Sequence, residues 1–515
     1  MNQWINSALC RSGVVGVFVC SGLALFAMAC SPAGVDSPVK QNNGASSSGG
    51  AAAGGTGSST GGKDNGGPSL GGNIVTEMPE GPCQGLECNV ASCTPGTSTT
   101  ISGKVFAPNG TLPLYNVLVY VPNGEVMPFA EGASCDRCGA SVTNPVTSAI
   151  TDETGAFKLE GAPTGVDVPL VIQVGKWRRQ IKVPAVTSCV DNPLTDPNMT
   201  RLPKNKTEGD IPRIAISVGG ADQMECLPLR LGIDPAEFTL PTGEGRIHLT
   251  VGHSNENGNM NQPVRAFDAT LNAAAALTSS EALWANTEAL MKYDIVILSC
   301  EGNSYARDKP MAVREAMYQY ASQGGRVFAS HWHNVWFEDG PAPLPTTGTW
   351  ETRMPNPAGN EQNENGDDTP VPATINQSFP KGAALAQWLL NVGASTSLGN
   401  MNLIYPRDNI QAVNDQVARE WISVNNPNFP EAPKAVQYMS FNTPIGVPEE
   451  MVCGREVYTN LHVAAIDNNT EANAMGFPAS CGQFELSAQE KAVAFMLFDL
   501  SACVMNDDLE PKPPK

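Results

Sequence analysis

Short apolar runs that alternate with longer helical segments constrain the fold of this chain more than any other feature. Strand-like runs at residues 246–251, 294–298 and 326–329 are separated by segments with helical periodicity. The expected helices cover residues 221–232, 279–291, 311–322 and 487–500, and further strand-like runs cover 211–218, 435–441 and 455–461. This alternation predicts a parallel sheet flanked by helices, and we expect the α/β domain to cover residues 211–505.

Side chains with chemical reactivity follow several of these runs. Four of the five histidines and one cysteine–glutamate pair lie just beyond strand-like runs: His253, His331, His333, His462, Cys300 and Glu301. Ligands of open α/β sheets bind at the carboxyl ends of the strands, and in a parallel sheet these ends share one edge. We therefore expect the six residues to converge in one cleft.

A metal site is one interpretation of this group. His331 and His333 are two residues apart, so in an extended segment their rings project to the same side. With His253 they would bind zinc or a similar divalent metal, and His462 and Glu301 are further candidates to complete the site. Imidazoles that are merely hydrogen-bonded within a loop are the structural alternative.

A catalytic cysteine is the second interpretation. Cys300 would be a nucleophile, His462 its base and His331 a polarising group, with Glu301 as a further catalytic carboxylate. The two interpretations predict different enzymes, because one is a metal-dependent hydrolase and the other is a Cys/His-dependent hydrolase.

Aromatic side chains beside the histidines suggest a sugar ligand. Trp332 and Trp336 would form a stacking wall, although packing beneath the irregular segment 341–379 explains them equally well. They are therefore candidate substrate-binding residues only if their rings face a cleft.

The first residues resemble a bacterial lipoprotein signal. Residues 1–29 contain an apolar run that is too short for a confident membrane span, and the run ends in Ala29-Cys30. The resemblance implies that Cys30 becomes the lipidated first residue, and Ser31 favours the outer membrane. The expected location is the cell envelope, with the membrane as a partner through the lipid anchor. An ordinary cleaved signal peptide is the alternative.

The remaining segments divide by composition. Residues 30–80 are rich in Gly and Ser and predict a flexible tether, and residues 81–97 are rich in cysteine. A β-rich domain over 98–192 and a linker over 193–210 precede the α/β domain, and residues 506–515 form a tail. The net charge of −20 argues against nucleic acid as a partner. The sequence gives no indication of the oligomeric state.

The cysteines are typical of an exported protein. Of the 14 cysteines, Cys10 and Cys20 leave with the signal and Cys30 is modified, which leaves the odd number of 11. Local clusters predict disulfides among Cys83, Cys88 and Cys93, between Cys135 and Cys138, and between Cys453 and Cys481. The predicted free thiol is Cys300. A zinc site at Cys135 and Cys138 is the alternative for that pair.

The smaller domain shows short alternating strands joined by turns, as expected of a β-sandwich. It resembles the carboxypeptidase regulatory-like domains, and residues 151–157 are the most specific part of the match. The resemblance implies a prealbumin-like or carbohydrate-binding-like sandwich. Such domains serve as spacers, and sugar binding is the alternative role.

The larger domain resembles the class I glutamine amidotransferase-like superfamily and, within it, the ThuA-like proteins. Residues 293–299, 324–331 and 454–462 carry the resemblance. It implies a flavodoxin-like fold and places His462 where the family has its histidine. The family's nucleophilic cysteine is replaced by the segment Ser330-His331-Trp332-His333, so glutamine hydrolysis by the family mechanism is not expected.

These observations predict a cell-surface lipoprotein that binds or processes an extracellular polymer, such as a polysaccharide or peptidoglycan. The alternative is a structural or adhesive envelope protein whose α/β domain is degenerate. The chain also resembles bacterial lipoproteins that carry the label tryptophan synthase alpha chain. That enzyme is an eightfold barrel, and neither the signal, the sandwich nor the strand order suits it.

Lipidation of Cys30 gives a direct test of the predicted location. We expect mass spectrometry of the mature N-terminus to find diacylglyceryl-cysteine, because acyl chains attach a folded domain to a membrane by hydrophobic burial. The Cys30→Ala variant should leave the membrane fraction. An unmodified N-terminus at another residue would contradict the prediction.

Overall fold

The computed structural model describes residues 83–138, 142, 144–253, 265–268, 273–350, 370–425, 434–463, 477–482 and 485–514. The expected signal peptide, Cys30 and the tether lie outside these residues. Residues Glu80–Lys515 form one compact unit. No helix within the described part of the chain is long and apolar enough to cross a membrane.

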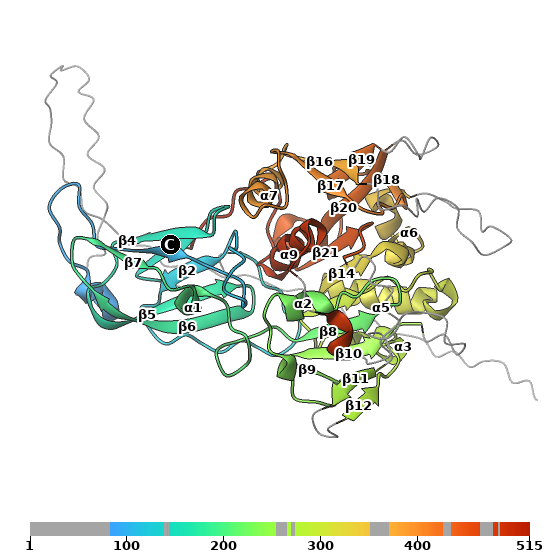
Figure 1. Ribbon diagram of the computed structural model, residues 1–515, viewed down its shortest axis with the longest axis horizontal. Coiled ribbons are helices and arrows are strands. Elements are labelled where there is room, and N and C mark those ends of the chain that lie inside the picture. Colours follow the sequence, from blue (N-terminus) through green and yellow to red (C-terminus); the bar gives the residue numbers. More distant parts are fainter. Residues whose placement is uncertain are drawn as a thin grey trace, which may run out of the picture. The chain divides into compact units, whose positions relative to one another are not determined.

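Two antiparallel-rich sheets form the first part of this unit (Figure 1). One has the order β4-β1-β7, with β4 (Ala156–Glu160), β1 (Thr100–Lys104) and β7 (Asp191–Leu194). The other has the order β3-β2-β5-β6, with β3 (Thr147–Ile150), β2 (Leu118–Val121), β5 (Gly165–Val174) and β6 (Trp177–Val186). Buried and exposed residues alternate along β4, as expected for a strand with one face in a core. The prediction of several short strands here is confirmed.

The second part contains a mixed sheet of ten strands, within the described residues. Six strands are parallel, in the order β9 (Phe238–Thr239), β10 (Ile247–Val251), β8 (Ile214–Val218), β13 (Ile295–Leu298), β14 (Arg326–Ser330) and β21 (Gly454–Thr459). Four antiparallel strands extend it: β20 (Lys434–Thr443), β19 (Ala418–Asn425), β16 (Val371–Ile375) and β17 (Asn400–Leu403).

The expectation of a wholly parallel sheet is therefore wrong for its second half. Strands β20 and β21 are joined only by residues 444–453. A parallel pair needs a crossover of a dozen or more residues, whereas an antiparallel pair can be joined by a short loop. The short connection forces the antiparallel pairing.

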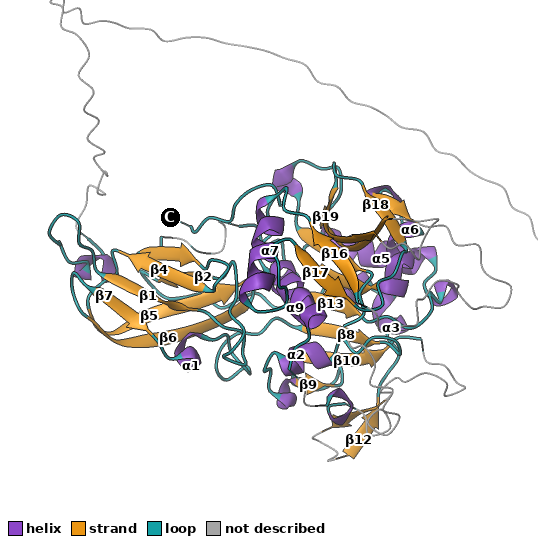
Figure 2. Ribbon diagram, turned by 45° about the horizontal axis from the view of Figure 1, so that its top comes forward, coloured by secondary structure: helices purple, strands orange, loops and turns teal. Residues whose placement is uncertain are grey.

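Helices cover both faces of this sheet (Figure 2). The core on one face contains residues of α7 (Pro380–Asn391) and α9 (Ala488–Ser501), and the core on the other contains residues of α5 (Met311–Ser322). Two expected helices have the predicted position, and α9 begins with a capping box of Ser487 and Glu490. The helix expected at 221–232 is shortened to α2 (Cys226–Arg230).

The helix expected at residues 279–291 is interrupted. It consists of α3 (Glu281–Trp284) and α4 (Thr287–Leu290), separated by Ala285 and Asn286. The Asn286 side chain accepts a hydrogen bond from the Ala289 N–H and so caps the second helix. This cap explains why a segment with helical periodicity does not form one continuous helix.

The β-rich and α/β parts share a core. The ring of Tyr115 stacks on Phe495 at 5.7 Å, and Trp177 packs edge-on against Phe498 at 6.0 Å. The Trp388 indole N–H donates to the Pro113 carbonyl at 2.9 Å. These contacts join β-rich segments to α7 and α9, so the two parts stabilise each other.

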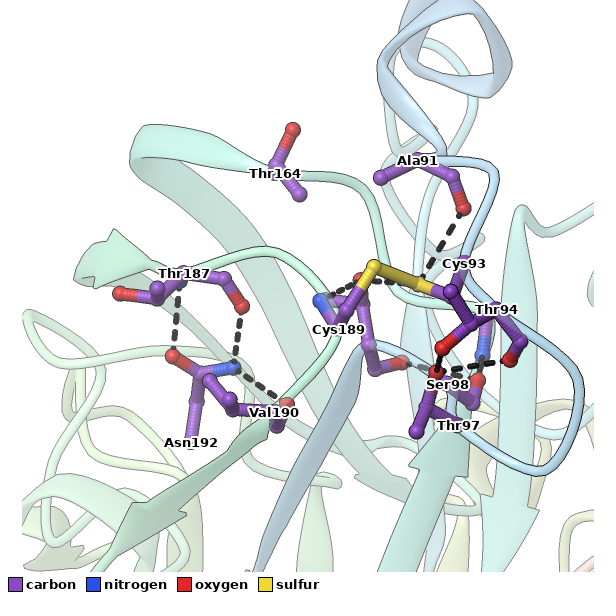
Figure 3. The surroundings of a disulfide bond; sticks show 12 residues. Ala91, Cys93, Thr94, Thr97, Ser98, Thr164, Thr187, Cys189, Val190 and Asn192 are labelled. Carbon is purple, nitrogen blue, oxygen red and sulfur yellow. Dashed lines mark hydrogen bonds between the residues drawn. A yellow bond between two sulfur atoms is a disulfide. The ribbon is translucent and has the colours of Figure 1, made fainter.

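Five disulfides join cysteines of the described residues, and three of them link cysteines more than 250 residues apart: Cys83–Cys88, Cys93–Cys189, Cys135–Cys453, Cys138–Cys503 and Cys226–Cys481. Only the first matches a local cluster. The predicted Cys135–Cys138 and Cys453–Cys481 pairs are wrong, and so is a zinc site at Cys135 and Cys138, because the fold brings distant partners to each cysteine. Figure 3 shows Cys93–Cys189 beside the bonds of the Asn192 amide to Thr187 and Val190.

A buried carboxyl on β21 makes the stability depend on pH. Glu456 is 2% exposed, its Oε1 has no hydrogen-bond partner within the described residues, and burial raises its pKa to about 8. The unfolded chain has an ordinary carboxyl pKa of about 4.3. Between these values the unfolded chain releases a proton that the folded chain retains, so the free energy of unfolding falls as the pH rises.

The Glu456→Gln variant should remove this dependence, because a neutral amide does not ionise. We expect the free energy of unfolding of the variant at pH 8 to equal or exceed that of the wild type. Between pH 5 and pH 8 this free energy should fall by about 1 to 3 kcal/mol less in the variant than in the wild type. Urea unfolding at both pH values measures this difference. The exposed Glu450→Gln is the control, and parallel pH profiles for wild type and Glu456→Gln would contradict the prediction.

Candidate metal centre

Three side chains from the carboxyl ends of adjacent parallel strands meet at one point. Cys300 follows β13, His331 follows β14 and His462 follows β21, and their ligand atoms all lie within 4.8 Å of one another. His331 Nδ1 is 3.4 Å from Cys300 Sγ and 3.0 Å from His462 Nε2. The convergence that the sequence predicts is confirmed for these three residues.

The spacing of the three atoms suits a metal ion. Zinc binds imidazole nitrogen at about 2.0–2.1 Å and thiolate sulfur at about 2.3 Å, so a tetrahedral site separates its ligand atoms by about 3.3–3.6 Å. Two of the three separations, 3.0 and 3.4 Å, are close to these edges, and the third, between Cys300 and His462, is within 4.8 Å. Two imidazoles and one thiolate form a donor set that favours zinc or another late transition metal. This buried group could therefore hold a metal ion.

Backbone N–H groups surround the sulfur of Cys300. The Gly302 N–H donates to Sγ at 3.4 Å, and the Trp332 backbone N–H also donates to it. Such donors stabilise a metal-bound thiolate. Cys300 is the free cysteine among the described residues, which confirms that prediction. Burial raises the pKa of Cys300 to about 12, so the thiol is protonated in the metal-free protein.

The imidazole of His462 is held in the neutral form. Burial first, and then the positive charge of Arg407, lower the pKa of His462 to about 3. The Gln489 amide donates to the His462 carbonyl at 2.9 Å. A neutral imidazole is the form that binds a metal.

One carboxylate positions both histidines. Asp222, in the loop after β8, accepts a hydrogen bond from Ser330 Oγ at 2.6 Å and another from the Val463 N–H at 2.9 Å. Ser330 directly precedes His331, and Val463 directly follows His462. Asp222 was not identified from the sequence, although its position just beyond a buried strand was the available signal.

His331 adopts a backbone conformation that is unusual for a residue with a side chain. Its φ of +43° lies in the left-handed region, which costs of order 1 kcal/mol or more. The Tyr458 hydroxyl donates to the His331 carbonyl at 2.8 Å and helps to hold this conformation. The resulting turn directs the ring toward Cys300 and His462.

His333 does not join the group, which corrects its assignment as a metal ligand. Residues His331–Asn334 form a 3-10 helix rather than an extended segment, so rings two apart diverge. His333 Nε2 donates to the Ser299 carbonyl at 2.9 Å, and Nδ1 accepts from the Trp336 indole N–H at 2.8 Å. Burial lowers the pKa of His333 well below its usual value. Both ring nitrogens are thus engaged in the core.

His253 and Glu301 form a neighbouring cluster outside the ligand group. His253 Nδ1 lies 2.5 Å from Asp308 Oδ2, and the His253 ring stacks on the Tyr305 ring at 3.6 Å. The backbone N–H of His253 donates to Glu301 Oε1 at 3.1 Å. Glu301 Oε2 forms a buried ion pair with Lys309 at 2.6 Å. The expected metal role of His253 is not supported, because its ring faces Asp308 rather than the ligand group. Glu301 is likewise engaged with Lys309.

The two tryptophans do not form a sugar-stacking wall. Trp332 is 8% exposed and its ring lies tilted against His331 at 4.7 Å. Trp336 is 2% exposed, bonds to His333 and packs edge-on against Trp284 at 5.5 Å. Packing, the alternative raised from the sequence, explains both residues.

No model of a known protein family matches the chain, and no curated protein matches it. A solved structure described as ThuA-like, from Bacteroides uniformis, is 15% identical with a TM-score of 0.22, and the match covers 39% of this chain and 75% of that chain. Two interface mutants of a type II cohesin–X–dockerin complex from Acetivibrio cellulolyticus are 15% and 16% identical, with TM-scores of 0.13 and 0.15. Those matches cover 29% and 26% of this chain and 79% and 85% of the other chains. TM-scores this low leave the function to be judged from the site.

The contrast between His333 and His462 is testable by stability. We expect His333→Ala to lower the free energy of unfolding by about 2 to 4 kcal/mol, because it leaves a cavity and removes the partners of Trp336 and Ser299. In metal-free protein, His462→Ala should lower the free energy of unfolding by less than half as much. Denaturant unfolding of both variants measures the difference, and equal losses would contradict the assignment of His333 to the core.

Proposed function

We propose that this chain is an exported hydrolase whose α/β part binds one divalent transition metal through Cys300, His331 and His462. The observation that carries the proposal is the convergence of one sulfur and two imidazole nitrogens within 4.8 Å at the carboxyl edge of the parallel strands. Side chains that bind or transform ligands collect at this edge in open α/β sheets.

Three protein ligands leave a coordination position for water or substrate. Catalytic zinc sites have this composition, whereas structural sites use four protein ligands. A metal bound there would supply Lewis acidity and lower the pKa of a bound water molecule. The protein contributes two oriented imidazoles, a sulfur that accepts backbone hydrogen bonds, and the Asp222 carboxylate that positions the strand ends.

The location and the substrate class are parts of the same proposal. Five disulfides are compatible with an oxidising compartment and so support export. The lipid anchor at Cys30 and the outer membrane rest on the sequence of the first residues. The sequence resemblances support two fold assignments, a prealbumin-like sandwich and a flavodoxin-like α/β fold. They also support an extracellular polymer, polysaccharide or peptidoglycan, as the ligand. A non-catalytic envelope protein remains the alternative.

A cysteine hydrolase is the second candidate. It is favoured by the 3.4 Å contact between Cys300 Sγ and His331 Nδ1, a distance at which an imidazole can accept the thiol proton. This candidate needs no metal. Metal content therefore separates the two.

Metal analysis of the purified, untagged mature protein tests the proposal. We expect about one zinc per chain after dialysis, and a loss of affinity of at least about tenfold in Cys300→Ser, His331→Ala and His462→Ala. His253→Ala is the matched control, because it removes a nearby imidazole outside the ligand group and should retain the metal. A metal-free wild type, or equal retention in all variants, would exclude the metal centre.

A further inference from the structure

We propose that Lys309 is a positioning residue of this centre, which keeps the Gly302 N–H directed at the sulfur of Cys300 and so limits the charge that the thiolate donates to the metal. The inference rests on the proposed metal centre and deepens it, because it names a residue that tunes the bound metal without touching it. It is carried by contacts between Lys309 and the residues on both sides of Gly302.

The turn after Cys300 brings a backbone donor to the sulfur. The Gly302 N–H donates to Cys300 Sγ at 3.4 Å, and Gly302 has a φ of +83°, in the left-handed region that glycine adopts without strain. Glycine also permits many other backbone conformations. The turn therefore needs contacts elsewhere that keep this N–H directed at the sulfur.

Lys309 supplies such contacts on both sides of the glycine. Its Nζ donates to Glu301 Oε2 at 2.6 Å and to the Ser304 carbonyl at 3.0 Å. Glu301 directly precedes Gly302, and Ser304 lies two residues after it. Because one ammonium group binds both neighbours, residues 301–304 cannot open without breaking a buried contact.

The ammonium group is itself fixed in place. Lys309 and Glu301 are both fully buried. The Lys309 Nζ atom lies 5.2 Å from the centre of the Trp284 ring and 5.9 Å from the centre of the Tyr305 ring, within the range of cation–π attraction. Movement away from Glu301 would leave two buried charges without partners, which is strongly unfavourable. The clamp on residues 301–304 is therefore rigid.

Glu301 extends this constraint to a second strand end. Its other oxygen, Oε1, accepts the backbone N–H of His253 at 3.1 Å. A Cβ atom at Gly252 would lie 2.1 Å from the same oxygen, so the carboxylate fits here because residue 252 is glycine. The ion pair thus ties the turn after β13 to the loop after β10.

The effect on the metal follows from the chemistry of the sulfur. A buried ion pair adds little net stability, because the desolvation of two charges offsets their attraction, so the main contribution of Lys309 and Glu301 is position. A thiolate donates charge strongly to a metal, and an N–H group bonded to the sulfur withdraws part of that charge. A metal that receives less charge polarises a bound water molecule more strongly. Lys309 would therefore favour the hydrolytic role of the centre.

Co²⁺ loading of the mature protein tests this inference, because the energy of the thiolate-to-Co²⁺ charge-transfer band depends on the hydrogen bonds to the sulfur. In Lys309→Met we expect this band to move to longer wavelength and the Co²⁺ affinity to fall by about tenfold or more. Lys309→Arg, which keeps a cation beside Glu301, should restore part of both.

Lys381→Met is the matched control. Lys381 also forms a buried ion pair, with Asp499, and its network reaches Arg455 at the amino end of β21 rather than the carboxyl end where the ligands lie. This variant should lose stability but keep the wild-type band and Co²⁺ affinity.

A double variant extends the test to a protein without an unpaired buried charge. Glu301→Gln/Lys309→Met removes both charges and retains an acceptor for the His253 N–H, and it should show the same band shift. A wild-type band and affinity in a folded Lys309→Met or double-variant protein, even with lower stability, overturns the inference and leaves the metal centre standing. A wild type that takes up no Co²⁺, or that shows no thiolate band, overturns both.

Discussion

The Asp222 carboxylate holds the ends of two strands in register, and the candidate centre depends on it. Strands β14 and β21 are paired along their length, but their pairing ends at Ser330 and Thr459, where the site begins. Asp222 continues the connection beyond that point by binding Ser330 and Val463. Because these residues flank His331 and His462, a shift of either strand end would separate the two imidazoles. Cys300 is held in another way, because the Gly302 and Trp332 N–H groups donate to its sulfur.

The surrounding fold makes this arrangement rigid. Cores on both faces bury the central parallel strands, so the strand ends have little freedom to move. Buried ion pairs join the helices to the sheet, since Arg455 on β21 contacts both Asp499 on α9 and Asp507 near the carboxyl terminus. The antiparallel strands also contribute to the surroundings of the site, because Gln437 on β20 donates a hydrogen bond to the Arg407 carbonyl.

Much of this architecture can be predicted from the sequence because local patterns determine it. Helix α5 follows from periodicity and a double glycine, and α9 follows from the Ser487 cap. The convergence of Cys300, His331 and His462 follows from one rule about parallel strands. His333 could not be predicted, because a 3-10 turn replaced the extended segment on which its assignment depended. The disulfide partners of Cys135 and Cys138 lie 318 and 365 residues away, and no local spacing encodes such pairings.

Zinc-edge X-ray absorption of the purified mature protein tests the central claim most directly, because it reports the atoms bound to the metal. The account predicts one sulfur at about 2.3 Å and two imidazole nitrogens at about 2.0–2.1 Å, with the sulfur contribution absent in Cys300→Ser. A shell without sulfur in the wild type, or a protein that holds no metal after purification, would contradict it.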